Sequence, residues 1–329
     1  IEVTLSEKLG PNQKVKFNLT YRVKIPSDKF TKYGYTAEGG FHLKDWFLKP
    51  ARFENNTFYK NSNFNVDDIT NAPADYQITF KTPQSQRLFT DLNVVSTDNQ
   101  GKHTIYTLEG KNRMDFCIYT EQQITFNRYK NDIADVYTNL KDNRLDDIQK
   151  AVIIDKVVKF TAENIGSTTN STIIVSQADY ERNPFYGLNQ LPAFISPYPD
   201  NFLYEIKFLK TYVYKYLKSN LKLNARDDNW IYDAIQVHIM MKYIDEYYPD
   251  MKMMGNISKL KILKGFNLFN LDFNEQYSYY YLLMARKNLD QPLGAPKNTL
   301  IKFNEKIYCT VFILFSIALT GKIKNIIQK

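Results

Sequence analysis

At 329 residues, with 43% hydrophobic and 24% charged residues, the chain has the composition of a globular protein, which excludes a disordered or fibrous one. Its net charge of +8 comes from lysines spread along the whole chain among 35 acidic residues, and this distribution argues against a dense basic surface for nucleic acid. The two cysteines, Cys117 and Cys309, are too few for a disulfide framework or a cysteine zinc site.

Residues 1–126 are predicted to form an antiparallel β-sandwich, because many short strands joined by loops are typical of that architecture. From Val15 to Ile25 apolar residues alternate strictly with polar ones, which is the pattern of a strand with one buried face, and Pro26 ends the run. Since the alternation is already under way at Ile1, we also expect a segment upstream of this chain. The other expected strands lie in the runs Tyr76–Phe80, Leu92–Val94, Ile105–Leu108, Met114–Ile118 and Ile124–Phe126.

The apolar period changes after about residue 130, and residues 127–329 are predicted to form a second domain. A helical stripe, Leu145–Phe160, is followed by a short buried strand at Ile173–Val175. Residues 183–192 have prolines near both ends and a central glycine, which favours an ordered loop or an edge strand over a helix. Two long helices are expected after this loop, over Phe202–Leu217 and Ile231–Tyr243.

Each of these last two helices contains one segment of a possible two-part motif. The first is Lys210–Tyr214, with the sequence KTYVY, and the second is Trp230–Gln236, with the sequence WIYDAIQ. Eighteen residues separate Tyr214 from Asp233. The layout resembles the H-E-x-x-H, eighteen residues, W-L-N-E-G-F-A arrangement of the gluzincin-clan zinc aminopeptidases, the membrane alanyl aminopeptidase family.

The resemblance extends over most of residues 15–306. Tyr186–Gln190, with the sequence YGLNQ, is similar to the G-A-M-E-N loop of that family, and Asn189 stands where a glutamate grips the free amino group of a substrate. We therefore expect Tyr186, Gly187, Asn189 and Gln190 to line a substrate groove. The segments FHLKDWFLKPA around Trp46, NPFYGLNQLP, and NLDQPL around Asp290 resemble divergent aminopeptidase-like proteins of Bacteroidetes.

From this resemblance we expect an α+β fold: an N-terminal antiparallel β-sandwich, then a thermolysin-like mixed sheet and helical catalytic-type domain that is incomplete at its C-terminal end. We also expect a location in the cell envelope or periplasm.

The residues that would hold zinc are replaced. Lys210 and Tyr214 stand at the two histidine positions, Thr211 at the general base, and Asp233 at the third ligand. A catalytic zinc takes three ligands from His, Asp, Glu or Cys, and an ammonium about 4 Å from a dication costs about 8 kcal/mol at an effective dielectric of about 20. Thr211 cannot act as a general base at neutral pH. We therefore expect no catalytic residue, no metal and no cofactor, with the Lys210 ammonium paired to Asp233 near the vacated metal position.

The main hypothesis is a non-catalytic aminopeptidase homologue that binds a peptide or protein. One alternative is an active metallo-aminopeptidase with zinc in an atypical site. The other is a cell-envelope interaction module that contacts the membrane through residues 307–321, an apolar run flanked by Lys306 and Lys322. This run is shorter than the roughly 20 residues of a spanning helix, so a buried helix is favoured over a membrane span. Nucleic acid is not an expected partner.

Overall fold

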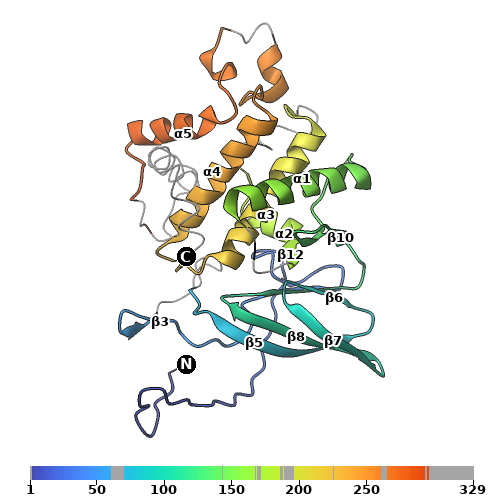
Figure 1. The fold of residues 1–329 in the computed structure, drawn as a ribbon, viewed down its shortest axis with the longest axis vertical. Helices are drawn as coiled ribbons and strands as arrows, with labels where there is room; N and C mark the ends of the chain where they lie inside the picture. Colours follow the sequence, from blue (N-terminus) through green and yellow to red (C-terminus); the bar gives the residue numbers. More distant parts are fainter. Residues whose placement is uncertain are drawn as a thin grey trace.

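A computed structural model describes residues 2–60, 70–142, 144–166, 168, 172–185, 188, 196–224, 226–260, 265–292 and 295. The chain has a mixed α+β fold, with sheets at one end and helices at the other (Figure 1). The predicted groove residues Tyr186, Gly187, Asn189 and Gln190, and the apolar run 307–321, lie outside the described residues. In the part of the chain that is described, no helix is both long enough and apolar enough to cross a membrane.

The first part of the chain, called the β unit, contains two antiparallel sheets that enclose one apolar cluster. Leu43, Leu88 and Ile118 of one sheet pack in this cluster with Leu108 of the other. A small hairpin, β3 (Phe53–Glu54) and β4 (Thr57–Phe58), stands beside them. The first sheet has the order β1 (Gly34–Tyr35), β2 (Phe41–Lys44), β9 (Cys117–Glu121), β6 (Arg87–Thr90), and the second the order β5 (Ala74–Pro83), β8 (His103–Arg113), β7 (Asn93–Gln100).

The structure changes two of the strand predictions. No strand forms over residues 15–25, which instead run as an exposed, extended segment, because no neighbouring strand of the described chain pairs with it. Ile124–Phe126 is likewise not a strand; the next strand, β10, begins at Asn127. Alternation specifies which face of a strand would be buried, but not that a pairing partner is within reach.

The second part, called the helical unit, begins with a mixed three-stranded sheet. β10 (Asn127–Lys130) pairs antiparallel with β11 (Asp135–Thr138), and β11 pairs parallel with β12 (Thr172–Val175). The parallel pair needs a crossover, which α1 (Asp147–Ile165) supplies. The remaining helices are α2 (Gln177–Arg182), α3 (Asp200–Asn220), α4 (Asn229–Tyr247) and α5 (Glu275–Arg286), with 3-10 turns η3 (Gly255–Lys259) and η5 (Asn267–Phe269).

Helix α1 confirms the predicted helix but not all of its predicted buried stripe. Asp146 caps it, accepting from the Gln149 backbone N–H while the Gln149 side chain accepts from the Asp146 backbone N–H. Val157 and Phe160 are buried as the stripe predicts, but Ile148 is 77% exposed and Val152 63% exposed. Ile148 and Val152 lie one turn apart on the outward face of α1, whereas the neighbouring Ile153 and Ile154 are buried in the core.

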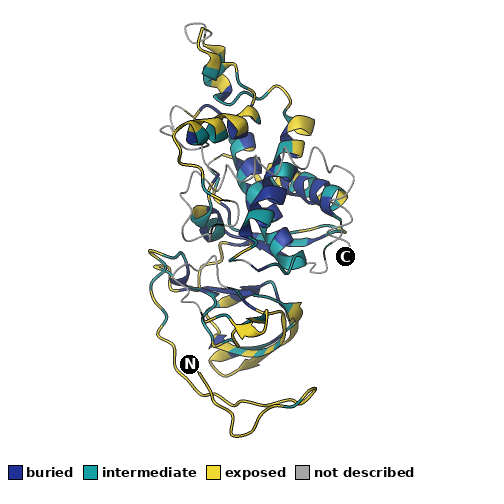
Figure 2. Cartoon of the chain, turned by 90° about the vertical axis from the view of Figure 1, so that its left-hand side faces the viewer, coloured by how far each residue is buried: buried dark blue, intermediate teal, exposed yellow. Residues whose placement is uncertain are grey.

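The core of the helical unit is built around α3, which is buried on most of its circumference. Helix α3 packs against α1, α4 and β12, and the buried residues concentrate in this region (Figure 2). The central helix also buries a carboxylate, Glu205, which is 1% exposed. Lys156 of α1 pairs with Glu205 at 2.5 Å, and the hydroxyls of Tyr243 and Tyr248 both donate to it. These three donors compensate the cost of burying the charge.

Changing Tyr243 to phenylalanine should lower the free energy of unfolding by about 1.5–3 kcal/mol, because the buried Glu205 carboxylate loses one donor while the ring remains. Urea unfolding of the purified variant measures the effect. Tyr279→Phe on α5, where the side chain is 39% exposed, is the control and should change stability by less than about 0.5 kcal/mol. Equal effects of the two substitutions would show that Glu205 does not depend on this hydroxyl.

Candidate functional site

The four residues at the metal positions that the resemblance implies lie on α3 and α4, as the helical periods predict. Lys210, Thr211 and Tyr214 belong to α3, and Asp233 belongs to α4. Thr211 and Asp233 are buried, and Lys210 and Tyr214 are half-buried. The structure therefore places the motif in the interior of the helical unit, at the packing surface between two long helices.

Two contacts fix how α4 faces α3 around this motif. The Gln236 side-chain amide donates to the backbone oxygen of Lys210 at 2.6 Å. The Lys218 ammonium lies 4.0 Å from the ring centroid of Tyr232. Asp233 lies between Tyr232 and Gln236 in the sequence of α4 and is buried.

The side chains at the first two positions are engaged with other protein groups. The Lys210 ammonium donates to the Asn183 side-chain oxygen at 3.1 Å. The Thr211 hydroxyl donates to the backbone oxygen of Lys207, one turn earlier in α3, at 2.9 Å. Asn183 is the first residue of the predicted loop segment, so that segment begins beside Lys210. The predicted pairing of Lys210 with Asp233 stays a prediction.

This donor set does not fit a catalytic zinc ion. An ammonium cannot coordinate a metal, the Thr211 hydroxyl is directed to its own helix backbone, and Asp233 is the one carboxylate among the four positions. In the described ranges there is no group of three or more His, Cys, Asp or Glu side chains that could hold a metal ion. Of the histidines, His238 lies on α4, where burial lowers its pKa below 6.5.

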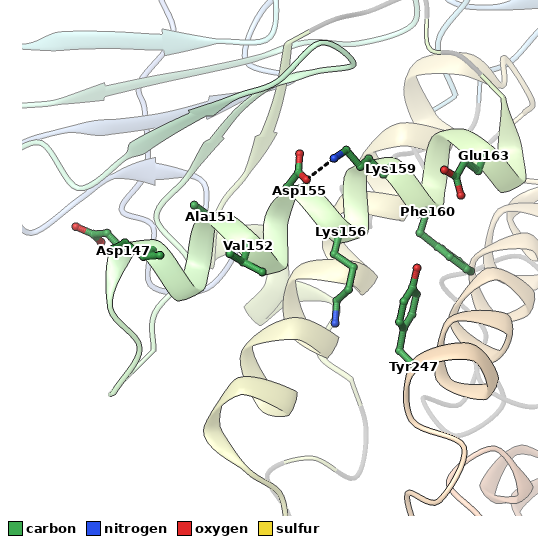
Figure 3. Close-up of a pocket in the computed structure, with 10 residues that line it drawn as sticks. Asp147, Ala151, Val152, Asp155, Lys156, Lys159, Phe160, Glu163 and Tyr247 are labelled. Atoms are coloured by element: carbon green, nitrogen blue, oxygen red, sulfur yellow. Dashed lines mark ion pairs between the residues drawn. The ribbon is translucent and has the colours of Figure 1, made fainter.

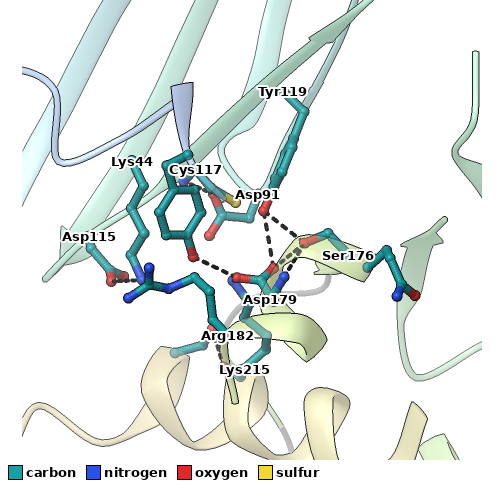
Figure 4. A network of polar contacts seen from close by, with 12 residues as sticks. Lys44, Asp91, Asp115, Cys117, Tyr119, Ser176, Asp179, Arg182 and Lys215 are labelled. Carbon is teal, nitrogen blue, oxygen red and sulfur yellow. Dashed lines mark hydrogen bonds and ion pairs between the residues drawn. The ribbon is translucent and has the colours of Figure 1, made fainter. Parts of the chain in front are cut away.

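A second group of polar side chains, which the sequence did not predict, lies where the β unit meets the helical unit (Figure 4). Its centre is the buried carboxylate of Asp179 on α2. Tyr33 and Tyr119 of the β unit donate to it at 2.8 and 3.1 Å. Ser176, the N-cap of α2, donates at 2.6 Å, and Lys215 of α3 pairs with it at 2.9 Å. We call these five residues the interface network.

The charges in the interface network stabilise one another. Burial alone raises the pKa of Asp179, but the ammonium groups of Lys215 and Lys44 outweigh it and hold that pKa far below 3.8. Burial alone lowers the pKa of Lys215, and the Asp179 charge raises it well above 10.5. Both groups are therefore ionised at neutral pH, which is the arrangement that a buried ion pair needs to offset desolvation.

The interface network also lies close to the segment Lys210–Tyr214. Lys215 follows Tyr214 directly on α3. Lys44 of β2 pairs with Asp115 at 3.8 Å, and its pKa, which burial alone lowers, is raised by Asp115, Asp45 and Tyr214 together. The β unit thus places a half-buried lysine, which is paired with a half-buried aspartate, near Tyr214.

An apolar cluster accompanies these charges across the boundary between the units. Phe89 and Tyr119 of the β unit pack with Phe126 and with Ile174 of β12. The Arg182 guanidinium of α2 lies 5.1 Å from the Tyr33 ring centroid and donates to the backbone oxygen of Thr31 at 2.6 Å. The two units are therefore joined by buried apolar and ionic contacts in addition to their peptide linkage.

A pocket of about 750 Å³ lies away from the motif, on the exposed side of α1 (Figure 3). It is lined by α1 residues including Val152 and Lys156, and by Tyr247 at the end of α4. None of the four inherited metal positions lines it. It therefore does not belong to the candidate site.

The stability of the interface network should depend on acid. Because the pKa of Asp179 is lower in the folded chain than its ordinary value of 3.8, its contribution is present above about pH 4 and is lost as the pH falls further. Urea unfolding at about pH 5, 4 and 3 should show a fall in the free energy of unfolding, and Asp179→Asn should make that fall smaller. An unchanged pH dependence in the variant would contradict this assignment.

Comparisons with known proteins place M1 zinc metallopeptidases among the structural neighbours. One such metallopeptidase, from Deinococcus radiodurans, aligns with a TM-score of 0.48 and 9% identity over 79% of this chain and 57% of its own. A mutant two-domain M1 zinc metallopeptidase bound to L-arginine aligns with a TM-score of 0.47 and 10% identity over the same shares. This chain thus spans little more than half the length of either protein. No protein-family model and no curated protein matches it.

Proposed function

We propose that this chain is a non-catalytic homologue of the zinc aminopeptidases and that it binds a peptide or protein at the inherited site. The proposal is based on the hydrogen bonds that the motif side chains make with other groups of the protein. Lys210 donates to Asn183 and Thr211 donates to its own helix, at the positions where the family resemblance implies a zinc ligand and a general base. The chain therefore has the two helices on which a metal site would be built, but Lys210 and Thr211 make hydrogen bonds within the protein.

Loss of catalysis follows from the chemistry of these side chains. Metal-assisted hydrolysis needs a Lewis acid to activate water and a base to accept its proton. The four positions offer one carboxylate, Asp233 of α4, and it is buried. A single carboxylate does not supply both functions.

The charged side chains around Lys210 and Asp233 favour the binding of a peptide. The Lys210 ammonium and the Asp233 carboxylate are a cation and an anion on two helices that pack together. Lys44 of the β unit lies near Tyr214 and pairs with Asp115. Such paired charges can complement the polar backbone and the charged ends of a peptide. The groove residues expected from the resemblance, including Asn189, would complete this surface.

The test combines hydrolysis with binding. With zinc added, the purified chain should hydrolyse aminoacyl chromogenic substrates no faster than buffer containing zinc alone. Calorimetric titration with a mixed peptide library, followed by its strongest members, should show saturable binding that Asp233→Asn weakens by about tenfold or more. Hydrolysis that needs zinc and is lost in Asp233→Asn would instead establish the atypical metallo-aminopeptidase.

A further inference from the structure

The pocket on the exposed side of α1 follows the whole length of that helix, and we call it the α1 groove (Figure 3). Its lining runs along α1 from Asp147 to Glu163, and Tyr247 at the end of α4 lines it too. The two acids are 16 residues apart, which corresponds to about 24 Å along a helix. The α1 groove is therefore long enough to hold about four turns of a second helix.

The α1 groove exposes apolar side chains in a row. Ile148 is 77% exposed and Val152 is 63% exposed, although α1 buries its other face in the core. Ala151 lies beside them, and the Tyr247 ring, 37% exposed, lines the same groove. An apolar row on the outer face of a helix is typical of a surface that another element covers.

The two lysines of the α1 groove are already paired within the protein. The Lys159 ammonium pairs with Asp155 on the same helix at 2.8 Å. The Lys156 ammonium pairs with the buried carboxylate of Glu205 at 2.5 Å. Neither cation therefore needs an anion from an occupant of the groove.

The acids at the two ends of the α1 groove lack such partners. The Asp147 side chain is 86% exposed and lies 3.9 Å from Lys150, which pairs more closely with Asp142, at 2.7 Å. Glu163 is exposed and forms no ion pair with any residue that the structure describes. The α1 groove therefore favours an apolar occupant that carries one cation at each end.

This chain contains a segment with that pattern. The apolar run 307–321, which lies outside the described residues, is flanked by Lys306 and Lys322. These two lysines are 16 residues apart, the same spacing as Asp147 and Glu163. As a helix, the 15 residues of the run would be about 22 Å long, which matches the length of the groove.

The course of the chain before this segment selects its direction. Helix α5 begins beside the end of α4, because the Asn274 side chain donates to the Met241 backbone oxygen at 3.0 Å and to Asp245 at 2.7 Å. Tyr247 follows in α4 and packs against Phe160, one turn before the Glu163 end of the groove. A segment that comes from α5 would therefore enter at that end.

The connection is also long enough. The described chain ends at residue 295, and the 11 residues from there to Lys306 can extend over at most about 40 Å. Helix α3, the longest described helix, has 21 residues and is about 31 Å long. The connection can therefore pass from one side of the helical unit to another.

We propose that residues 306–322 form a helix that lies antiparallel to α1 in the α1 groove of the same chain. Lys306 then lies beside Glu163, and Lys322 beside Asp147. In this register Ile317 lies beside Val152, so that apolar side chains meet between the two ion pairs. The apolar run is then buried against α1 and is not free to contact a membrane.

The native thiol of Cys309 tests the register. Position 309 lies next to position 310, which the antiparallel register places opposite Lys159, so Lys159→Cys should form a disulfide with Cys309 within one chain under mild oxidation. Mass spectrometry of the digested, unreduced chain detects it. Thr97→Cys on the exposed strand β7 is the control and should give at most a trace of this product.

Amide hydrogen exchange tests the apolar contact with two matched substitutions. Residues 307–321 should be protected in the unchanged chain, and Val152→Asp should lower that protection by at least about tenfold, because it places a charge under the docked helix. Val95→Asp on β7, where the side chain is 52% exposed, should lower it by less than about twofold.

Three results would overturn the proposal. The first is a run that is unprotected, or whose protection Val152→Asp leaves unchanged, because the run then does not lie on α1. The second is a disulfide that forms only between two chains, which would show that a second copy supplies the segment. The third is sedimentation of the unchanged chain with phosphatidylglycerol vesicles, lost in Ile313→Asp, which would show that the run binds a membrane instead.

Discussion

Replacing Asp179 with asparagine should lower the free energy of unfolding by about 3–5 kcal/mol, because the change leaves the Lys215 ammonium buried without its counter-charge. Because asparagine and aspartate have nearly the same shape, the decrease in the free energy of unfolding would measure the loss of the charge and not a change in packing. The Tyr33 and Tyr119 hydroxyls would also donate to a neutral amide oxygen instead of a carboxylate, which weakens both hydrogen bonds.

Urea unfolding at neutral pH, followed by circular dichroism and by tyrosine fluorescence, measures this loss. Asp272→Asn is the control, because Asp272 pairs with Lys252 at 2.5 Å on the surface, where both side chains are at least 40% exposed. Exposed pairs contribute about 0–1 kcal/mol, so the control should be close to neutral. A loss below about 1 kcal/mol for Asp179→Asn would contradict the view that the interface network holds the two units together.

Restoring the missing ligands should create a zinc site. The variant that combines Lys210→His, Thr211→Glu, Tyr214→His and Asp233→Glu carries the full motif of the resembled family on the same two helices. Positions 210 and 214 are one turn apart on α3, so two histidines there face the same way, and the contact between Gln236 and the Lys210 backbone keeps α4 beside them. We expect one zinc ion per chain after dialysis, against none for the unchanged chain.

The control variant carries both histidines with Asp233→Asn, so that the third ligand is absent. It should bind zinc at least about tenfold more weakly than the full variant, because two histidines alone leave the site short of a carboxylate. Equal affinities for the two variants would show that position 233 does not face the other two.

The helices and strands that could be predicted are those whose own residues show a clear apolar period. Helices α3 and α4 and strand β12 were predicted correctly, because their apolar residues recur with the period of the element that they form. Helix α1 was also predicted, although Val152 is exposed because it lies on the face of the helix that points away from the core. The predicted division at residue 126 stays a prediction, as do the groove residues.

The interface network could not be predicted in the same way. Tyr33, Tyr119, Asp179 and Lys215 come from four separate parts of the chain, and only the folded arrangement brings them together. One local signal was available: Ser176, followed three residues later by Asp179, is the pattern of a helix N-cap. The strand predicted over residues 15–25 does not form. Its alternating pattern is visible in the sequence, but the pattern does not show whether a neighbouring strand is available for pairing.

The most direct test of the proposal that this chain does not bind zinc is elemental analysis of the unchanged chain after purification in zinc-containing buffer and dialysis. The side chains at positions 210, 211, 214 and 233 predict well under about 0.1 zinc ion per chain, because a site with one carboxylate and an adjacent ammonium binds a dication weakly. About one zinc ion per chain, reduced by Asp233→Asn, would contradict the account.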